Sequence, residues 1–219
     1  MNIFNKIKQD PRVRTYLRKA DEHLGEMGFT EHGLRHAELV SNIAKNIMER
    51  LEYPERMKEI AAIASFMHDI GNVINRVNHP VASAMMAENI LYQEGMAFEE
   101  IGMVMGAIGN HDEDSGEIVN PATAALVLAD KSDVHRSRVR NPDRSTFDIH
   151  DRVNYAVEHS FLVVDAEERT ITLSLRIDTA LVPLMDYFEI FLTRMLMCRR
   201  AAEALECDFR LNINETRLL

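Results

Sequence analysis

Six histidine and aspartate side chains have the types and spacing that could support metal chemistry: His36, His68, Asp69, His79, His111 and Asp130. Imidazole and carboxylate groups together form a mixed nitrogen and oxygen donor set, which suits iron, manganese, zinc, cobalt or nickel. Six such ligands are more than one tetrahedral ion needs. The set therefore predicts two divalent metal ions, iron or manganese before zinc, cobalt or nickel, with Asp69 placed to bridge them.

The segments that must position these side chains have an apolar repeat of about 3.6 residues, which predicts helices. The predicted helices cover residues 34–51, 54–67, 80–91, 98–108 and 121–134. Gly71 is interpreted as the end of the second of them. Asp130 falls in the middle of the last one, on the same face as Leu126 and Val127. A carboxylate on an apolar face needs a partner, because burying an isolated charge is very costly, and a metal ion would supply that partner.

The last third of the chain has a different pattern. Residues 171–177 alternate between apolar and polar, which predicts the second strand of a hairpin. A long helix over 182–205 and a third strand over 208–214 follow. The predicted fold is therefore mainly α, with an all-helical metal-binding domain over residues 1–145 and a small α+β (ββαβ) C-terminal appendage over residues 146–219.

Composition and charge restrict the class of protein. The 219 residues carry a formal net charge of −10, which disfavours long nucleic acid as a partner because phosphate backbones are bound by an excess of Lys and Arg. A small phosphorylated substrate stays open, since metal ions or local arginines can supply positive potential. No segment reaches the length of a membrane span, the first twenty residues do not resemble a signal peptide, and two cysteines are too few for a disulfide framework. We expect a cytoplasmic protein that does not bind membranes.

The order of the six side chains resembles that of the HD superfamily of metal-dependent phosphohydrolases. The resemblance covers roughly residues 30 to 140 and depends on three segments, ASFMHDIGN, NHPVASAMMAENIL and LADKSD. It implies a first metal ion held by His36, His68, Asp69 and Asp130, and a second held by Asp69, His79 and His111.

Four further side chains are candidates for contact with a substrate. Asn72 stands where many members of the superfamily carry a lysine that contacts substrate. Lys131 or Arg136 could hold phosphate groups, although a solvated surface at a helix C-terminus explains Arg136 equally well. His32 lies one turn before His36, where it could reach the site or remain a surface residue.

Hydrolysis of a phosphate ester or anhydride, with a nucleotide as the expected substrate, is the preferred function. In this hypothesis a metal-bound hydroxide attacks phosphorus, and Asp69, the predicted catalytic residue, sets the spacing of the two metals. Two alternatives remain open: a mixed-valent di-iron oxygenase built on the same ligands, and a regulatory domain that binds metal without catalysis. An exposed edge in the small sheet favours pairing with a second subunit, so we expect a homodimer.

Overall fold

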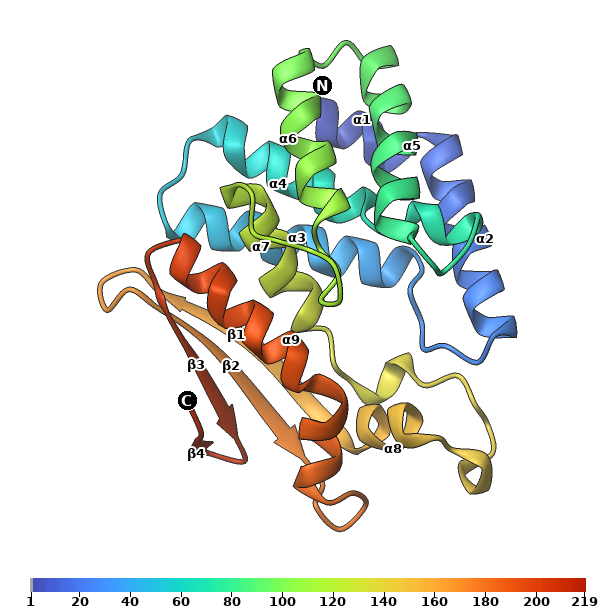
Figure 1. The fold of residues 1–219 in the computed structure, drawn as a ribbon, viewed down its shortest axis with the longest axis vertical. Helices are drawn as coiled ribbons and strands as arrows, with labels where there is room; N and C mark the ends of the chain where they lie inside the picture. Colours follow the sequence, from blue (N-terminus) through green and yellow to red (C-terminus); the bar gives the residue numbers. More distant parts are fainter. Residues whose placement is uncertain (1) are drawn as a thin grey trace.

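The computed structural model describes residues 2–219, and the N-terminal two thirds of the chain are helical (Figure 1). α4 lies at the centre of this part, where it contacts α1, α3, α6 and α7. Residues 60–67 of α4 are buried on every side, which explains why this segment is apolar or small throughout. The elements are α1 (Ile3–Gln9), α2 (Pro11–Glu26), α3 (Leu34–Arg50), α4 (Glu55–Met67), the 3-10 helix η1 (Ile70–Val73), α5 (His79–Gln93), α6 (Phe98–Gly109) and α7 (Pro121–Lys131).

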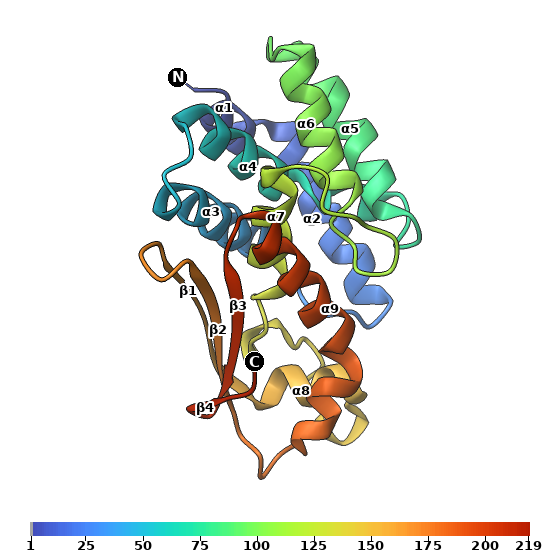
Figure 2. The same cartoon turned by 60° about the vertical axis from the view of Figure 1, so that its left-hand side comes forward.

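The C-terminal part is a four-stranded sheet with one long helix on it (Figure 2). β1 and β2 form an antiparallel hairpin, α9 then crosses the sheet, and β3 returns parallel to β2 before β4 pairs with it. The mainly α fold with a small α+β C-terminal part is thereby confirmed. The elements are η2 (Arg136–Arg138), η3 (Arg144–Thr146), α8 (Ile149–Ala156), β1 (Val157–Asp165), β2 (Thr170–Ile177), α9 (Leu184–Ala204), β3 (Asp208–Ile213) and β4 (Thr216–Arg217).

One hydrophobic core runs from the helices into the sheet. α9 packs against the sheet with one side and against α7 with another. Phe191 and Met195 of α9, Leu126 of α7 and Leu173 of β2 all belong to this core and are buried. The division of the chain at residue 145 stays a prediction. Within residues 2–219, every helix is too short or too polar to cross a membrane.

α7 ends at Lys131 and not near residue 134, so Asp130 lies in its last turn and not in the middle of a helix. Side chains beyond the end explain the early stop. The hydroxyl of Ser132 donates to the carbonyl of Ala129 at 2.7 Å, and Asp133 turns away to bind groups on α3. Such side-chain contacts compete with the continuing helix.

Gly71 does not end α4, which stops at Met67; it lies inside η1. A Cβ atom at Gly71 would lie 2.5 Å from both the carbonyl oxygen of His79 and the backbone nitrogen of Ser83. The glycine is therefore required because η1 and α5 approach each other closely, and not because a helix terminates there. The sequence pattern also does not predict the short elements α8 and β4.

Burial makes the thiol of Cys198 unreactive. It is 1% exposed in α9, and burial raises its pKa to about 12, so almost none of it is thiolate at pH 8. We expect its alkylation by iodoacetamide at pH 8 to be at least about 100-fold slower in the folded protein than in denaturant, as mass spectrometry of the modified peptide would measure. Equal rates in the two states would contradict this burial.

Candidate metal centre

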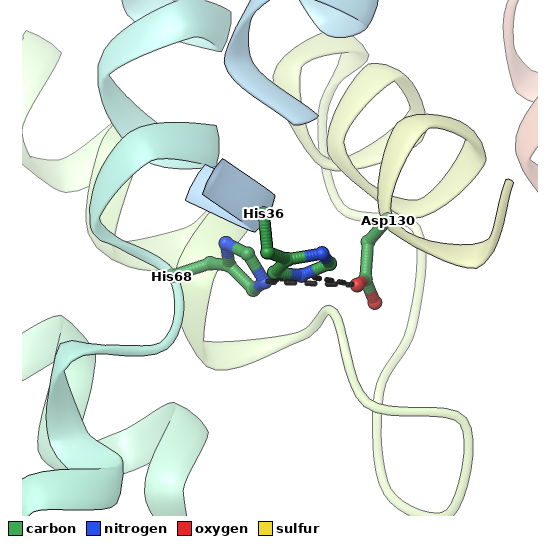
Figure 3. A group of neighbouring side chains, drawn as sticks. All are labelled: His36, His68 and Asp130. Carbon is green, nitrogen blue, oxygen red and sulfur yellow. Dashed lines mark hydrogen bonds and ion pairs between the residues drawn. The ribbon is translucent and has the colours of Figure 1, made fainter. Parts of the chain in front are cut away.

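Three helices bring together one half of the centre (Figure 3). His36 lies in the first turn of α3, His68 directly follows α4, and Asp130 lies in the last turn of α7. The Nε2 atom of His36 is 3.3 Å from that of His68 and 3.2 Å from the Oδ1 atom of Asp130. The Oδ2 atom of Asp69 completes this group, 3.4 Å from the Nε2 atom of His68.

The other oxygen of Asp69 faces a second pair of histidines. Its Oδ1 atom is 3.3 Å from the Nε2 atom of His79, the first residue of α5, and 4.0 Å from that of His111, which follows α6. The two Nε2 atoms are 3.2 Å apart. The six side chains singled out in the sequence therefore lie together, and the two oxygens of Asp69 point into different halves of the cluster. How many ions the cluster holds stays a prediction.

The hydrogen bonds of the four imidazoles show that a cation fits between them. Each Nδ1 atom lies within hydrogen-bond distance of an oxygen acceptor, which places a proton on Nδ1 and turns Nε2 toward the cluster. The Nε2 atoms then face one another and the carboxylates, so the arrangement needs positive charge, either as protons on Nε2 or as a metal ion. Ligands that share one ion at about 2.0–2.2 Å are separated by distances of this size. The acceptors are Asp133 Oδ2 for His36, Ser65 O for His68, Arg76 O for His79 and Ile108 O for His111.

Both aspartates are ionised, although Asp69 is buried and only 13% of the Asp130 side chain is exposed. Burial alone would raise the pKa of Asp69, but the charge of His68 and the hydrogen bond from His79 hold it well below its usual range. Burial opposes ionisation of Asp130 as well, and here the charge of Lys131 is the main factor that lowers the pKa. The two carboxylates are thus in the form that binds a metal.

The pKa values of two imidazoles are shifted in opposite directions: that of His111 is lowered, and that of His36 is raised. Burial lowers the pKa of His111 well below 6.5. Burial also lowers that of His36, but hydrogen bonds to Asp130 and Asp133 outweigh it and raise the pKa to about 9. The environment of His36 therefore stabilises a cation, which a metal ion would provide in place of the proton.

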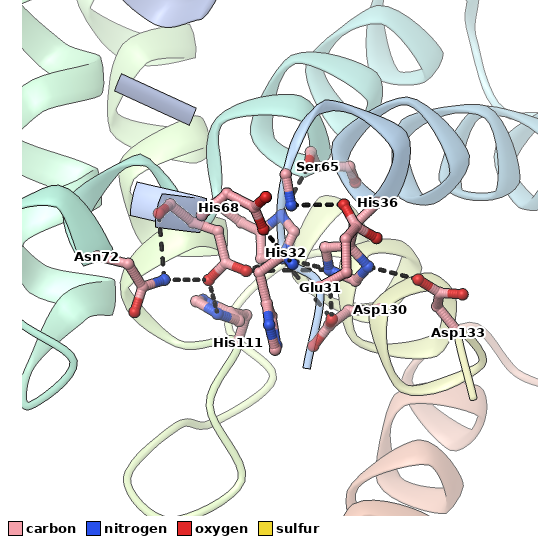
Figure 4. Close-up of polar contacts among 12 residues, drawn as sticks. Glu31, His32, His36, Ser65, His68, Asn72, His111, Asp130 and Asp133 are labelled. Atoms are coloured by element: carbon pink, nitrogen blue, oxygen red, sulfur yellow. Dashed lines mark hydrogen bonds and ion pairs between the residues drawn. The ribbon is translucent and has the colours of Figure 1, made fainter. Parts of the chain in front are cut away.

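Two polar side chains outside the cluster, Asn72 and Asp133, form hydrogen bonds with residues of the cluster, and Figure 4 shows the two on opposite sides of it. The amide of Asn72 donates to the Oδ1 atom of Asp69 at 2.8 Å and is 1% exposed. Asp133 accepts from His36 at 2.7 Å and is itself neutralised by Arg35 at 2.8 Å. Asp133 was not among the predicted site residues, although it lies three residues after Asp130, within LADKSD.

Removing Asp133 should weaken metal binding without removing a ligand. A carboxylate behind a ligating histidine fixes the ring and raises its basicity, and losing one typically costs 10–100-fold in affinity. We expect Asp133→Ala to lower metal affinity by about that factor, measured by competition with a chelator. Asp114→Ala, which removes an exposed carboxylate in the 110–120 loop, is the control. Unchanged affinity in Asp133→Ala would show that the contact with His36 contributes nothing.

A small polar cavity opens onto the cluster. It has a volume of about 30 Å³, and Lys131, Arg138 and Arg194 contribute to its walls. Glu113 joins two of these cations: its carboxylate lies 2.6 Å from Lys131 and 2.6 Å from Arg194. Because Arg194 belongs to α9, the C-terminal part of the chain contributes to the centre. Arg76, Glu113 and Arg194 were not among the predicted site residues.

The four predicted substrate contacts lie in different places. His32 lines the cavity, with its ring 5.4 Å from that of His36 and its Nδ1 atom 2.7 Å from the carbonyl of Thr30. Lys131 lines the cavity too, whereas Asn72 does not line it and is hydrogen-bonded to Asp69. Arg136 does not reach the cavity, because it pairs with Glu158 of β1 at 3.2 Å.

The chain matches a known protein family and is similar to two uncharacterized proteins. The model of the HD domain family matches residues 33–142. An uncharacterized protein of Methanocaldococcus jannaschii is 29% identical over an alignment of 171 residues that covers 68% of this chain and 66% of that protein. An uncharacterized protein of Clostridium beijerinckii is 30% identical over 121 residues, 52% of this chain and 75% of that protein. The chain thus spans just under two thirds of the length of the first relative. The family match covers half of the chain and all six clustered side chains, so this protein belongs to the HD domain family.

Proposed function

We propose that the protein is a metal-dependent phosphohydrolase that cleaves a phosphate ester or anhydride, with a nucleotide as the expected substrate. The observation that supports this most is the wall of the cavity, where arginine and lysine side chains adjoin the ligand cluster. Among the described residues that line it, Val134 alone is apolar. A polar cavity with several cations suits an anionic substrate and offers little to a hydrocarbon.

The ligand cluster fits two divalent ions, for which iron or manganese is our first expectation. When bound, such ions lower the pKa of a water molecule and neutralise charge that develops on phosphoryl oxygens. Asp69 would hold both halves of the cluster at a fixed separation, and Asn72 would keep its carboxylate oriented. Lys131 and Arg138 would face the phosphate from the wall. His32 would accept a hydrogen bond at Nε2 from a hydroxyl or amino group of the substrate, because its Nδ1 proton is donated to the carbonyl of Thr30.

The proposal is tested on protein purified without oxygen. Metal per chain is measured by mass spectrometry, and the same sample is assayed for phosphate release from a panel of nucleotides and simple phosphate esters. About two metal ions per chain together with metal-dependent phosphate release would support the hydrolase. Two iron ions with oxygen uptake and no phosphate release would instead indicate the oxygenase alternative. Full metal with neither activity would indicate a regulatory domain.

A further inference from the structure

Arg76 differs from the other cations around the cavity because no carboxylate balances its charge. It lies between η1 and α5, partly buried, and it lines the cavity. Its Nη1 atom is 3.4 Å from the Nε2 atom of His79 and 3.4 Å from the Oδ1 atom of Asn72. Its guanidinium group lies over the ring of Phe29, 5.6 Å from the centroid. Within residues 2–219, its polar contacts are thus to an imidazole and an amide, and it makes no ion pair with a carboxylate.

The remaining cations of the wall are already paired. Lys131 contacts Glu113 at 2.6 Å and Asp130 at 2.8 Å, and Arg194 contacts the same Glu113. Arg138 lies 3.6 Å from the buried carboxylate behind His36. Binding an anion to any of these groups must compete with an existing carboxylate. Arg76 can accept an anion without losing an ion pair.

The size of the cavity limits which part of a substrate can enter. A volume of about 30 Å³ has room for about two water molecules. The phosphoryl group is the part of a nucleotide that is small enough to approach the ligand cluster at this mouth. The apolar surface available to the rest of the substrate is therefore outside, where Phe29 is 41% exposed next to Arg76.

We propose that Arg76 binds the phosphoryl group and selects a terminal phosphate, on a monoester or at the end of an anhydride, over an internal phosphodiester. This inference rests on the proposed hydrolase function. A terminal phosphate carries more negative charge than a diester and has three peripheral oxygens, two of which match the paired N–H groups of a guanidinium. A diester has two peripheral oxygens and a single negative charge, so fewer of its oxygens remain for Arg76 once others face the metal site. Asn72 cannot take this role, because its amide is engaged by Asp69.

Binding of inorganic phosphate to the metal-loaded protein tests the contact directly. Isothermal titration calorimetry compares the wild type with Arg76→Gln, Arg76→Lys and the control Arg18→Gln, an exposed arginine of α2 that pairs with Glu22. We expect Arg76→Gln to keep its metal content and to bind phosphate about 10- to 100-fold more weakly. The lysine variant should recover part of the affinity, and the control should match the wild type.

Kinetics on a matched pair of substrates test the selection. For p-nitrophenyl phosphate, Arg76→Gln should lower kcat/KM about 10- to 100-fold, whereas for bis(p-nitrophenyl) phosphate the loss should be several-fold smaller. Equal losses for the two substrates would overturn the selection of a terminal phosphate. Unchanged phosphate affinity in Arg76→Gln with its metal in place would overturn the contact itself.

The two proposals fail in distinguishable ways. If the wild type hydrolyses the monoester and Arg76→Gln does so equally well, the role of Arg76 is wrong and the hydrolase function stands. If the wild type binds phosphate through Arg76 but hydrolyses none of the substrates, the phosphate site stands and the hydrolase function is wrong. A wild type that carries metal and binds no phosphate would overturn the role of Arg76.

Discussion

Replacing Asp69 with alanine should abolish metal binding and turnover together. The side chain places one oxygen 3.4 Å from His68 and the other 3.3 Å from His79, so its removal takes a ligand from both halves of the cluster. It also leaves Asp130 as the one remaining carboxylate of the six clustered side chains, on the side of His36 and His68. We expect metal content to fall below about one tenth of the wild-type value and phosphate release to fall at least about 1,000-fold. Metal analysis and the phosphate assay on the same sample measure both.

A graded variant separates loss of a ligand from loss of its support. Asn72→Ala keeps the Asp69 carboxylate and removes the amide that orients it, so it should retain metal and lose roughly 10-fold in activity. Circular dichroism confirms that both variants are folded. An Asp69→Ala protein that is folded, holds wild-type metal and turns over at the wild-type rate would be incompatible with the proposed mechanism.

Gly71→Ala should destabilise the protein and impair the metal centre although Gly71 has no side chain to bind anything. The added methyl would lie 2.5 Å from the backbone of His79 and Ser83, and these are main-chain atoms that cannot rotate away. α5 would have to move, and His79 moves with it. We expect the free energy of unfolding to fall by at least about 2 kcal/mol, together with a loss of metal affinity. Urea denaturation and chelator competition measure the two effects.

Gly102→Ala is the matched control. Gly102 lies within α6, and a Cβ atom there would meet nothing within 4 Å. The same substitution at this position should leave metal affinity unchanged and stabilise the protein by about 0.5–1 kcal/mol, since alanine is the better helix former. Equal effects of the two substitutions would show that the close approach of η1 and α5 does not matter.

The helical part of the fold could be predicted because α2 and α3 bury one face and so have a regular apolar pattern, and because α4, which is buried on every side, is apolar or small throughout residues 60–67. The six ligands could be found for a related reason: His36 and Asp130 are polar residues at positions that the pattern assigns to the interior, where a charge needs a partner. The resemblance to the HD superfamily then implied which of the six side chains hold the first metal ion and which hold the second. The sequence of α8 shows little apolar periodicity, because this helix has only about two turns.

Other parts of the site depend on contacts that the pattern does not encode. The end of α7 is set by the side chains of Ser132 and Asp133, whose partners lie far away in the sequence. Arg136 and Arg138 are two residues apart in a run of similar cations, yet only Arg138 lines the cavity, because η2 turns the chain between them. Charge alone therefore could not identify which arginine reaches the site.

Arg194 extends from α9 to the metal centre, and this limits which parts of the protein could be exchanged with those of its relatives. α9 joins β2 to β3, so the position of Arg194 depends on the whole C-terminal part of the chain. Its contact with Glu113 continues through Lys131 to the ligand Asp130. A chimera that combined these helices with a C-terminal segment lacking this arginine would leave Glu113 with one cation in place of two. The C-terminal part of the chain is therefore coupled to the metal centre through this series of ion pairs.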